Sequence, residues 1–138
     1  MSETNRNTKD NIMKKSSLLR SFGYSIEGLL TAARHERSMR IHLLATILIV
    51  ALGAWVGLEK WEWVAVVFCC AAVISLECVN TSLEAAVDLV SPEFHPLAKK
   101  AKDCAAGAVL IASIWAAVAG GTIFFPKLYY FIVELFGA

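Results

Sequence analysis

The feature that most constrains this chain is an unbroken run of 18 residues, 41–58, that contains no Asp, Glu, Lys or Arg. A run of this length is near the lower limit for an α-helix that crosses a hydrocarbon layer about 30 Å thick. Two further apolar stretches follow at 61–90 and 104–125, and the first of these becomes polar only after Leu76. We therefore predict an all-α integral membrane fold with three transmembrane helices.

The composition agrees with this class and argues against others. Hydrophobic residues make up 57% of the 138 residues and charged residues 18%, whereas soluble domains average about 45–50% and about 25%. The net charge is only +1, which argues against a nucleic-acid partner bound through bulk positive charge. The bilayer is therefore the predicted surrounding of most of the chain.

The remaining segments give the predicted domain organisation. Residues 1–15 are polar and are predicted to be disordered. Residues 16–39 place apolar side chains on one helical stripe, which is typical of an amphipathic helix that lies at a membrane surface or packs against partner helices. The predicted membrane domain covers residues 16–130, and residues 131–138 form a C-terminal tail.

Basic residues predict the orientation of the three spans. Eight of them precede the first span, one (Lys60) lies in the first turn, three lie in the loop before the third span, and one (Lys127) lies near the C-terminus. Segments rich in Lys and Arg tend to stay in the cytoplasm. We therefore predict a multi-pass protein whose N-terminus and second loop are cytoplasmic.

Small residues predict where spans approach each other closely. The third span is rich in Ala and Gly, and Gly53 and Gly57 form a G-x-x-x-G pair in the first span. In lipid, such small residues let helix backbones come close together. We expect both spans to use these faces for packing.

Four polar residues on one side of the second span are its most informative feature, and we call them the polar stripe. Glu77, Asn80, Glu84 and Asp88 are spaced by three, four and four residues, so they share one helix face. Counted from Trp63 at about 1.5 Å per residue, Glu77 lies about 21 Å into the bilayer and Glu84 about 31 Å, near its boundary. Ionisable groups at membrane depth are costly and usually mark function. We expect a proton acceptor at Glu77 and a divalent cation at Glu84.

Other polar residues are predicted at the same membrane boundary. Glu36 ends the amphipathic helix, and Lys102 and Asp103 are predicted to open the third helix. A lysine in a first turn opposes the helix dipole, but it suits an anion bound at free backbone N–H groups. We interpret these residues as an interfacial site for a polyanion and a metal, facing a group that enters from the lipid.

The sequence resembles the small bacterial diacylglycerol kinase and undecaprenol kinase family. The resemblance rests on GYSIEGLLTAARHERSMRIHLL at 23–44, ECVNTSLEAAVD at 77–88 and SPEFHPLAKKAKDCAAGAVLIA at 91–112. It implies a homotrimer of three-span subunits with an amphipathic surface helix, in the bacterial cytoplasmic (inner) membrane. It also implies a lipid kinase that transfers the γ-phosphate of ATP, with Mg²⁺, to the hydroxyl of a membrane lipid.

Matching positions imply roles for individual residues. By this resemblance, Glu77 accepts the proton of the lipid hydroxyl, and Glu36 and Glu84 hold the metal. Asn80 and Asp88 support the site. The residues implied to contact ATP are Tyr24, Glu36, Glu84, Glu93, Phe94, His95, Lys102 and Asp103.

The lipid acceptor and the function class each have alternatives. The RIHLL run at 40–44 and the SPEFHPLAK run at 91–99 favour undecaprenol over diacylglycerol. A proton or cation pathway lined by the polar stripe would also explain the carboxylates, but it leaves Glu36 and Lys102 without a role. A scaffold protein whose polar stripe only joins subunits would be favoured if Glu77→Gln left every activity intact.

Overall fold

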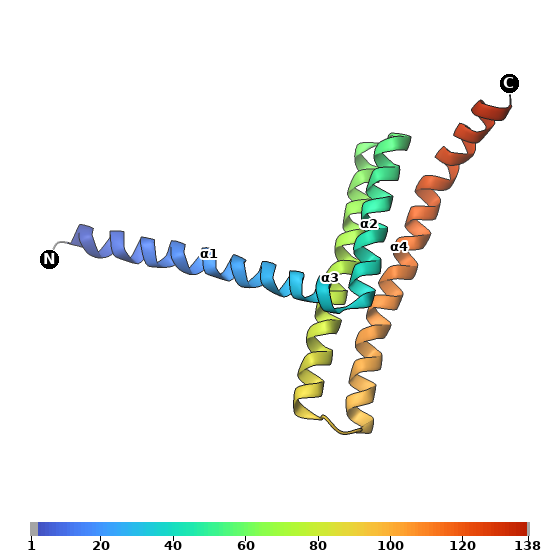
Figure 1. The fold of residues 1–138 in the computed structure, drawn as a ribbon. Helices are drawn as coiled ribbons and strands as arrows, with labels where there is room; N and C mark the ends of the chain where they lie inside the picture. The colour runs from blue at the N-terminus through green and yellow to red at the C-terminus, as the bar shows by residue number, and fades with distance from the viewer. Residues whose placement is uncertain (1–2, 138) are drawn as a thin grey trace. The chain divides into compact units, whose positions relative to one another are not determined.

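The computed structural model describes residues 3–137, and within this range the chain forms four α-helices (Figure 1). They are α1 (Glu3–His35), α2 (Arg37–Val56), α3 (Lys60–Val90) and α4 (Pro96–Phe136). The last three are long and apolar enough to cross a membrane. The predicted all-α fold with three candidate spans is thus confirmed.

The first helix belongs to a unit of its own, and the chain from Glu36 onward forms a second compact unit. α1 covers residues 3–15, where the sequence predicts disorder, and residues 1 and 2 lie outside the described range. Residues 1–22 contain no proline or glycine, so no helix-breaking residue interrupts the N-terminal half of α1. The side chains of Phe22 and Ile26 are more than half exposed, as expected of an amphipathic helix that is covered by lipid or by a partner.

Local signals explain where α2 stops and α3 starts. Gly57 ends α2 with a φ of 71°, a left-handed conformation that glycine adopts without strain. A capping box starts α3, in which the backbone N–H of Glu59 donates to the carboxylate of Glu62 at 2.7 Å. Gly53 makes room for Leu58, whose Cδ1 would lie only 2.8 Å from a Cβ at position 53. Within this unit the G-x-x-x-G pair therefore shapes the turn.

The third candidate span is longer than its predicted range of 104–125. α4 begins at Pro96 and continues through Pro126 to Phe136, so residues 131–136 of the predicted tail are helical, and Ala138 lies outside the described range. At about 1.5 Å per residue its 41 residues reach about 60 Å, roughly twice the thickness of a hydrocarbon layer. Part of α4 therefore extends beyond any bilayer of that thickness that it crosses.

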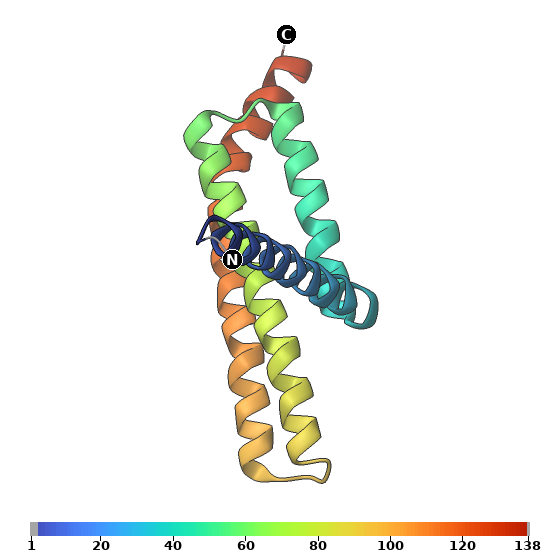
Figure 2. The same ribbon diagram turned by 90° about the vertical axis from the view of Figure 1, so that its left-hand side faces the viewer.

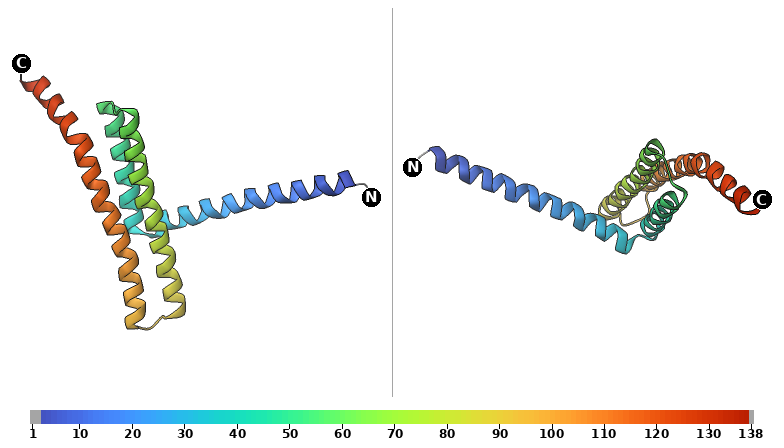
Figure 3. Two further views of the ribbon diagram at one scale, coloured as in Figure 1. Left: turned by 180° about the vertical axis from the view of Figure 1, so that it is seen from behind. Right: turned by 90° about the horizontal axis from the view of Figure 1, so that it is seen from above.

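Helices α3 and α4 run antiparallel and make the most extensive contact of the second unit (Figures 1 and 2). α2 lies along the half of this pair that is nearer the α2–α3 turn, as Figure 1 and the left view of Figure 3 show. The buried core of this half is built around Leu58, Val66 and Phe124. Ala116 and Gly120 of α4 line a cavity of about 40 Å³ against α3. Among the described residues nothing lies within 4 Å of a Cβ built at Gly120, so the predicted close approach of α4 through its small residues is not seen at this position.

Candidate active site

The polar stripe lies on one continuous helix, α3, and its burial decreases steadily along the chain. Glu77 is 2% exposed and Asn80 is 8% exposed. Glu84 is half-buried and Asp88 is exposed. Among the described residues, Glu77 and Asn80 are the only fully buried polar or charged ones. The stripe therefore leads from an open helix end into the interior of the unit.

The first turn of α2 contacts the buried end of the stripe. The hydroxyl of Ser38 donates a hydrogen bond to Oε1 of Glu77, and the neighbouring side chain of Met39 is fully buried. Glu77 is thus level with the basic start of α2, which contains Arg37 and Arg40 ahead of the apolar run. Sequence reasoning missed Ser38, since its partner is 39 positions away and no spacing rule connects the two.

The middle of the stripe offers oxygen atoms that have few partners. The side-chain amide of Asn80 donates from Nδ2 to Oε1 of Glu84 at 3.0 Å. The other amide atom, Oδ1 of Asn80, is buried and has no hydrogen-bond partner among the described residues, and the same holds for the Thr81 hydroxyl. Buried polar atoms are rarely left unpaired, which indicates a ligand, water or partner at this level.

A cleft of about 360 Å³ lies at the open end of the stripe, between the end of α3, the 91–95 loop and the start of α4. This volume is within the range of small-molecule sites. Lys102 binds Asp88 at 2.6 Å across the cleft, and Lys99 pairs with Asp103. The other lining residues are Val87, Ser91, Pro92, Glu93, Phe94, His95 and Ala98.

The structure brings together six of the predicted site residues around this cleft. Five of them are predicted ATP contacts in the 91–95 loop and α4, and the sixth is the supporting residue Asp88 of α3. The side chain of Phe94 is 82% exposed at the mouth of the cleft. His95 caps α4, because its Nδ1 accepts a hydrogen bond from the backbone N–H of Leu97 at 3.2 Å. This bond fixes the orientation of the ring and leaves Nε2 available. The cleft is lined by Glu93, Phe94, His95, Lys102 and Asp103, with Asp88 opposite.

The sequence-based placement of Lys102 in a first helical turn is wrong. α4 begins at Pro96, so Lys102 and Asp103 lie in its second turn. The helix dipole and the free N–H groups fade within the first turn, and they do not explain this lysine. Its contact with the cleft depends on the ion pair to Asp88 instead.

The predicted metal residues have donor atoms of the right kind but do not form a closed cage. Among the described residues, no three His, Cys, Asp or Glu side chains gather closely enough to hold a metal ion. Glu36 is the N-cap of α2 and makes no side-chain capping bond, and Glu84 keeps one oxygen beyond its bond to Asn80. Magnesium is commonly held by one or two carboxylates together with substrate phosphates, so the residues fit a cation that arrives with a ligand.

Tyr24 is the one predicted site residue that lies in the first unit. It belongs to α1, and its side chain is 69% exposed there. The two units are separate, and its nucleotide contact stays a prediction.

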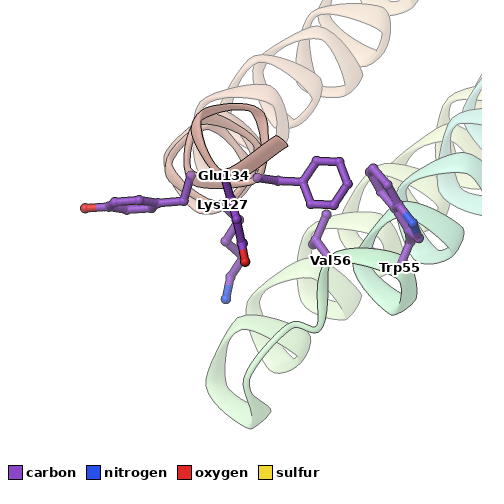
Figure 4. A pocket seen from close by; sticks show the side chains of 6 residues that line it. Trp55, Val56, Lys127 and Glu134 are labelled. Atoms are coloured by element: carbon purple, nitrogen blue, oxygen red, sulfur yellow. The ribbon is translucent and has the colours of Figure 1, made fainter. Parts of the chain in front are cut away.

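A second pocket, of about 310 Å³, lies at the opposite end of the three-helix unit (Figure 4). Trp55 and Val56 of α2 face Lys127 and Glu134 of α4, and the rings of Trp55 and Phe131 meet edge-on at 4.9 Å. Lys127 is held by Glu62 at 3.0 Å. Behind this pocket lies the apolar core, and none of the described residues that line the pocket is both buried and polar. We predicted no function for these residues.

Comparison with known proteins gives a consistent result. The family described as prokaryotic diacylglycerol kinase matches residues 23–124. An undecaprenol kinase of Bacillus subtilis (strain 168) is 36% identical over 121 residues, covering 88% of this chain and 98% of the relative. A diacylglycerol kinase of Synechocystis sp. is 40% identical over 113 residues, covering 81% of this chain and 65% of the relative.

A third relative agrees with these two. A diacylglycerol kinase of Escherichia coli (strain K12) is 33% identical over 101 residues, covering 73% of this chain and 83% of the relative. The matched residues include the polar stripe, the 91–95 loop and the start of α4. The chain belongs to the prokaryotic diacylglycerol kinase family and is an enzyme of the lipid kinase class.

Proposed function

We propose that this protein transfers the γ-phosphate of ATP to the hydroxyl group of undecaprenol, in a Mg²⁺-dependent reaction at the cytoplasmic face of the bacterial inner membrane. The lipid oxygen forms a bond to the γ-phosphorus while the bond from that phosphorus to the β–γ bridging oxygen breaks. ADP leaves, and the hydroxyl proton passes to Glu77. Such transfer depends on positioning and electrostatics more than on covalent chemistry by the protein.

The observation that carries this proposal is the position of Glu77. Its carboxylate is 2% exposed, and the polar stripe connects it to the cleft that begins at Asp88. A lipid hydroxyl reaches such a group from the hydrocarbon, while a phosphate donor reaches the other end of the stripe from water. An acid–base group must lie within hydrogen-bond reach of the proton that it takes. We assign this role to the buried carboxylate because it lies where an acceptor that stays in the membrane would need it.

The cleft is suited to a nucleotide in its size and in its polar groups. Lys102 and Lys99 supply ammonium groups that exchange their aspartate partners for phosphate oxygens. Phe94 offers an exposed ring, and His95 offers a free Nε2. The cleft is lined by three carboxylates, those of Asp88, Asp103 and Glu93, and by two lysines, so its carboxylates outnumber its ammonium groups. A nucleotide polyanion therefore binds there best together with a divalent cation.

The metal is assigned to Glu36 and Glu84, with Asn80 orienting the second of these carboxylates. A Mg²⁺ ion held by these carboxylates together with the nucleotide would neutralise charge on the phosphate oxygens. Glu36 is kept free for this role, because it precedes α2 and makes no capping bond of its own. The unpaired Oδ1 of Asn80 is a further oxygen at the same level.

Bilayer and subunit contacts are proposed to cover the rest of the surface. Only 11–17% of the most apolar window of each candidate span is buried within one copy. Lipid and two further copies of the chain, in a homotrimer, would cover these faces. The eight basic residues before the first span support a cytoplasmic N-terminus, and Tyr24 is proposed to reach the nucleotide from the surface helix.

Undecaprenol is the proposed acceptor on two grounds. The RIHLL run at 40–44 and the loop sequence at 91–99 favour it. The relative named undecaprenol kinase also aligns with this chain over 98% of its own length. Diacylglycerol is the second candidate, because several relatives of similar identity carry that name.

The test is a transfer assay on the purified full chain in detergent. Protein is incubated with γ-labelled ATP and Mg²⁺, and undecaprenol and diacylglycerol are offered in parallel. We expect labelled undecaprenyl phosphate, and no product when EDTA replaces Mg²⁺. Preferential labelling of diacylglycerol would overturn the acceptor assignment. Labelling of neither lipid, together with Glu77-dependent proton flux in liposomes, would overturn the kinase proposal in favour of a conducting protein.

A further inference from the structure

The hydrogen bond from Ser38 joins two helices at the most buried charged group of the described chain. Ser38 lies in the first turn of α2, and Glu77 lies in the middle of α3. The bond involves Oε1 of the carboxylate. A buried carboxylate accepts hydrogen bonds through both oxygens, so the second oxygen, Oε2, remains for another donor.

The start of α2 holds the Ser38 hydroxyl in a defined place. Met39 is 0% exposed and fixes the adjacent residue in the packed unit. Arg40 donates its backbone N–H to the carbonyl of Glu36, so the first turn of the helix is closed. The partial positive charge of a helix N-terminus also favours a carboxylate nearby. The closed first turn and the buried Met39 therefore fix the backbone that carries the Ser38 hydroxyl, although residue 38 itself is exposed, and its acceptor Glu77 is buried.

We propose that Ser38 is a positioning residue for proton acceptance by Glu77. Its hydroxyl occupies Oε1 and thereby directs Oε2 toward the lipid hydroxyl, from which Oε2 takes the proton during phosphate transfer. Ser38 itself exchanges no proton with the substrate. This inference rests on the proposed function and adds to it a residue from a different helix.

The experiment compares three substitutions of Ser38 in the full chain. Ser38→Ala removes the hydroxyl, whereas Ser38→Thr keeps it, and Ser38→Val has the shape of threonine without the hydroxyl. Ser82→Ala is the matched control, because the Ser82 hydroxyl bonds only to the Cys78 carbonyl of its own helix. For each variant kcat, the KM values for ATP and lipid, and the folded fraction by size exclusion are measured.

We expect kcat per folded enzyme to fall about 10- to 100-fold in the alanine and valine variants, the loss typical of one hydrogen bond to a charged group. The KM for ATP should stay within twofold of the parent value, because Ser38 does not line the cleft. Threonine should keep kcat within about threefold of the parent, and Ser82→Ala should match the parent.

Two outcomes overturn the positioning role. One is equal kcat for the threonine and valine variants. The other is a loss that disappears once activity is divided by the folded fraction, which would make Ser38 a purely structural residue. An active parent enzyme with either outcome leaves the proposed function intact, whereas an inactive parent enzyme overturns the proposed function as well.

Discussion

The three-helix unit has a pocket at each end. The two pockets have similar volumes, and each contains a lysine that forms an ion pair with a carboxylate, but they differ in the residues that lie behind them. At one end a cleft of about 360 Å³ contains the Lys102–Asp88 pair, and at the other a pocket of about 310 Å³ contains Lys127, paired with Glu62. Behind the first cleft, polar groups continue inward to the buried Glu77. Behind the second lies an apolar core around Val66 and Phe124.

This difference teaches that a pocket with an ion pair is not sufficient to locate chemistry. An ion pair at a membrane boundary can also form between a lysine just after one span and a glutamate at the start of another, as Lys127 and Glu62 do. A buried carboxylate is better evidence of a functional site, because burying a charge costs free energy. The continuous path from cleft to buried carboxylate is what singles out the Glu77 end.

The largest expected effect comes from removing the buried carboxylate. Glu77→Gln should lower kcat for phosphate transfer by about 10²–10⁴-fold, the usual contribution of a general base. Glu134→Gln, at the other end, should leave kcat within twofold. Both are measured with γ-labelled ATP and the lipid acceptor in detergent. Equal kcat values for Glu77→Gln and Glu134→Gln would contradict the assignment of the chemistry to the Glu77 end.

The next effect concerns the two lysines. Lys102→Ala should raise the KM for ATP about 10- to 100-fold, because a charge-assisted hydrogen bond to phosphate is lost. Lys127→Ala serves as its counterpart and should leave this KM unchanged. Steady-state titrations of ATP at saturating lipid provide the measurement. A similar rise in both variants would show that nucleotide binding does not depend on the cleft.

A moderate effect on stability is expected at the end that contains the α2–α3 turn, to which the proposal assigns no chemistry. Gly53→Val should destabilise the protein by about 1–3 kcal/mol, because the new side chain overlaps Leu58 and Trp63. Gly120→Ala is the control, since nothing lies within 4 Å of a Cβ there. Thermal unfolding in detergent compares them. Should Gly53→Val unfold at the parent temperature, the close contact at the α2–α3 turn would be refuted.

The smallest effect is expected from the Lys127–Glu62 pair. Both side chains are about a quarter exposed, and such pairs contribute about 0–1 kcal/mol. Lys127→Ala should therefore lower the unfolding free energy by at most about 1 kcal/mol. A larger loss in the same unfolding assay would mean that this ion pair, rather than the apolar core, holds the end of α4.

Much of this arrangement follows from the sequence, for physical reasons. The apolar runs are long enough to require helices, and a period of about 3.6 residues places Glu77, Asn80, Glu84 and Asp88 on one face. These are local properties of a single helix. The same local reasoning put Lys102 one turn too early, because Pro96 starts α4 before the apolar run begins.

The parts that the sequence could not provide depend on contacts between helices. The bond from Ser38 to Glu77 needs the relative height of α2 and α3, which no single-helix pattern contains. The ion pair of Lys102 with Asp88 depends in the same way on how the 91–95 loop folds back. The sequence predicted that Gly57 belongs to a helix-packing motif. In the structure it ends α2 with a left-handed φ, a role that depends on the turn between α2 and α3.

The central claim is that the nucleotide binds from the cleft at the open end of the polar stripe, with its phosphates directed along the stripe toward the proton acceptor Glu77 at the buried end. Binding of a non-hydrolysable ATP analogue to Glu77→Gln, in the preparation used for the transfer assay, tests this claim most directly. We predict a Kd within about twofold of the parent protein together with loss of labelled lipid, since the proposal assigns Glu77 to proton transfer and not to nucleotide binding. Parallel loss of binding and transfer in a folded variant would contradict it.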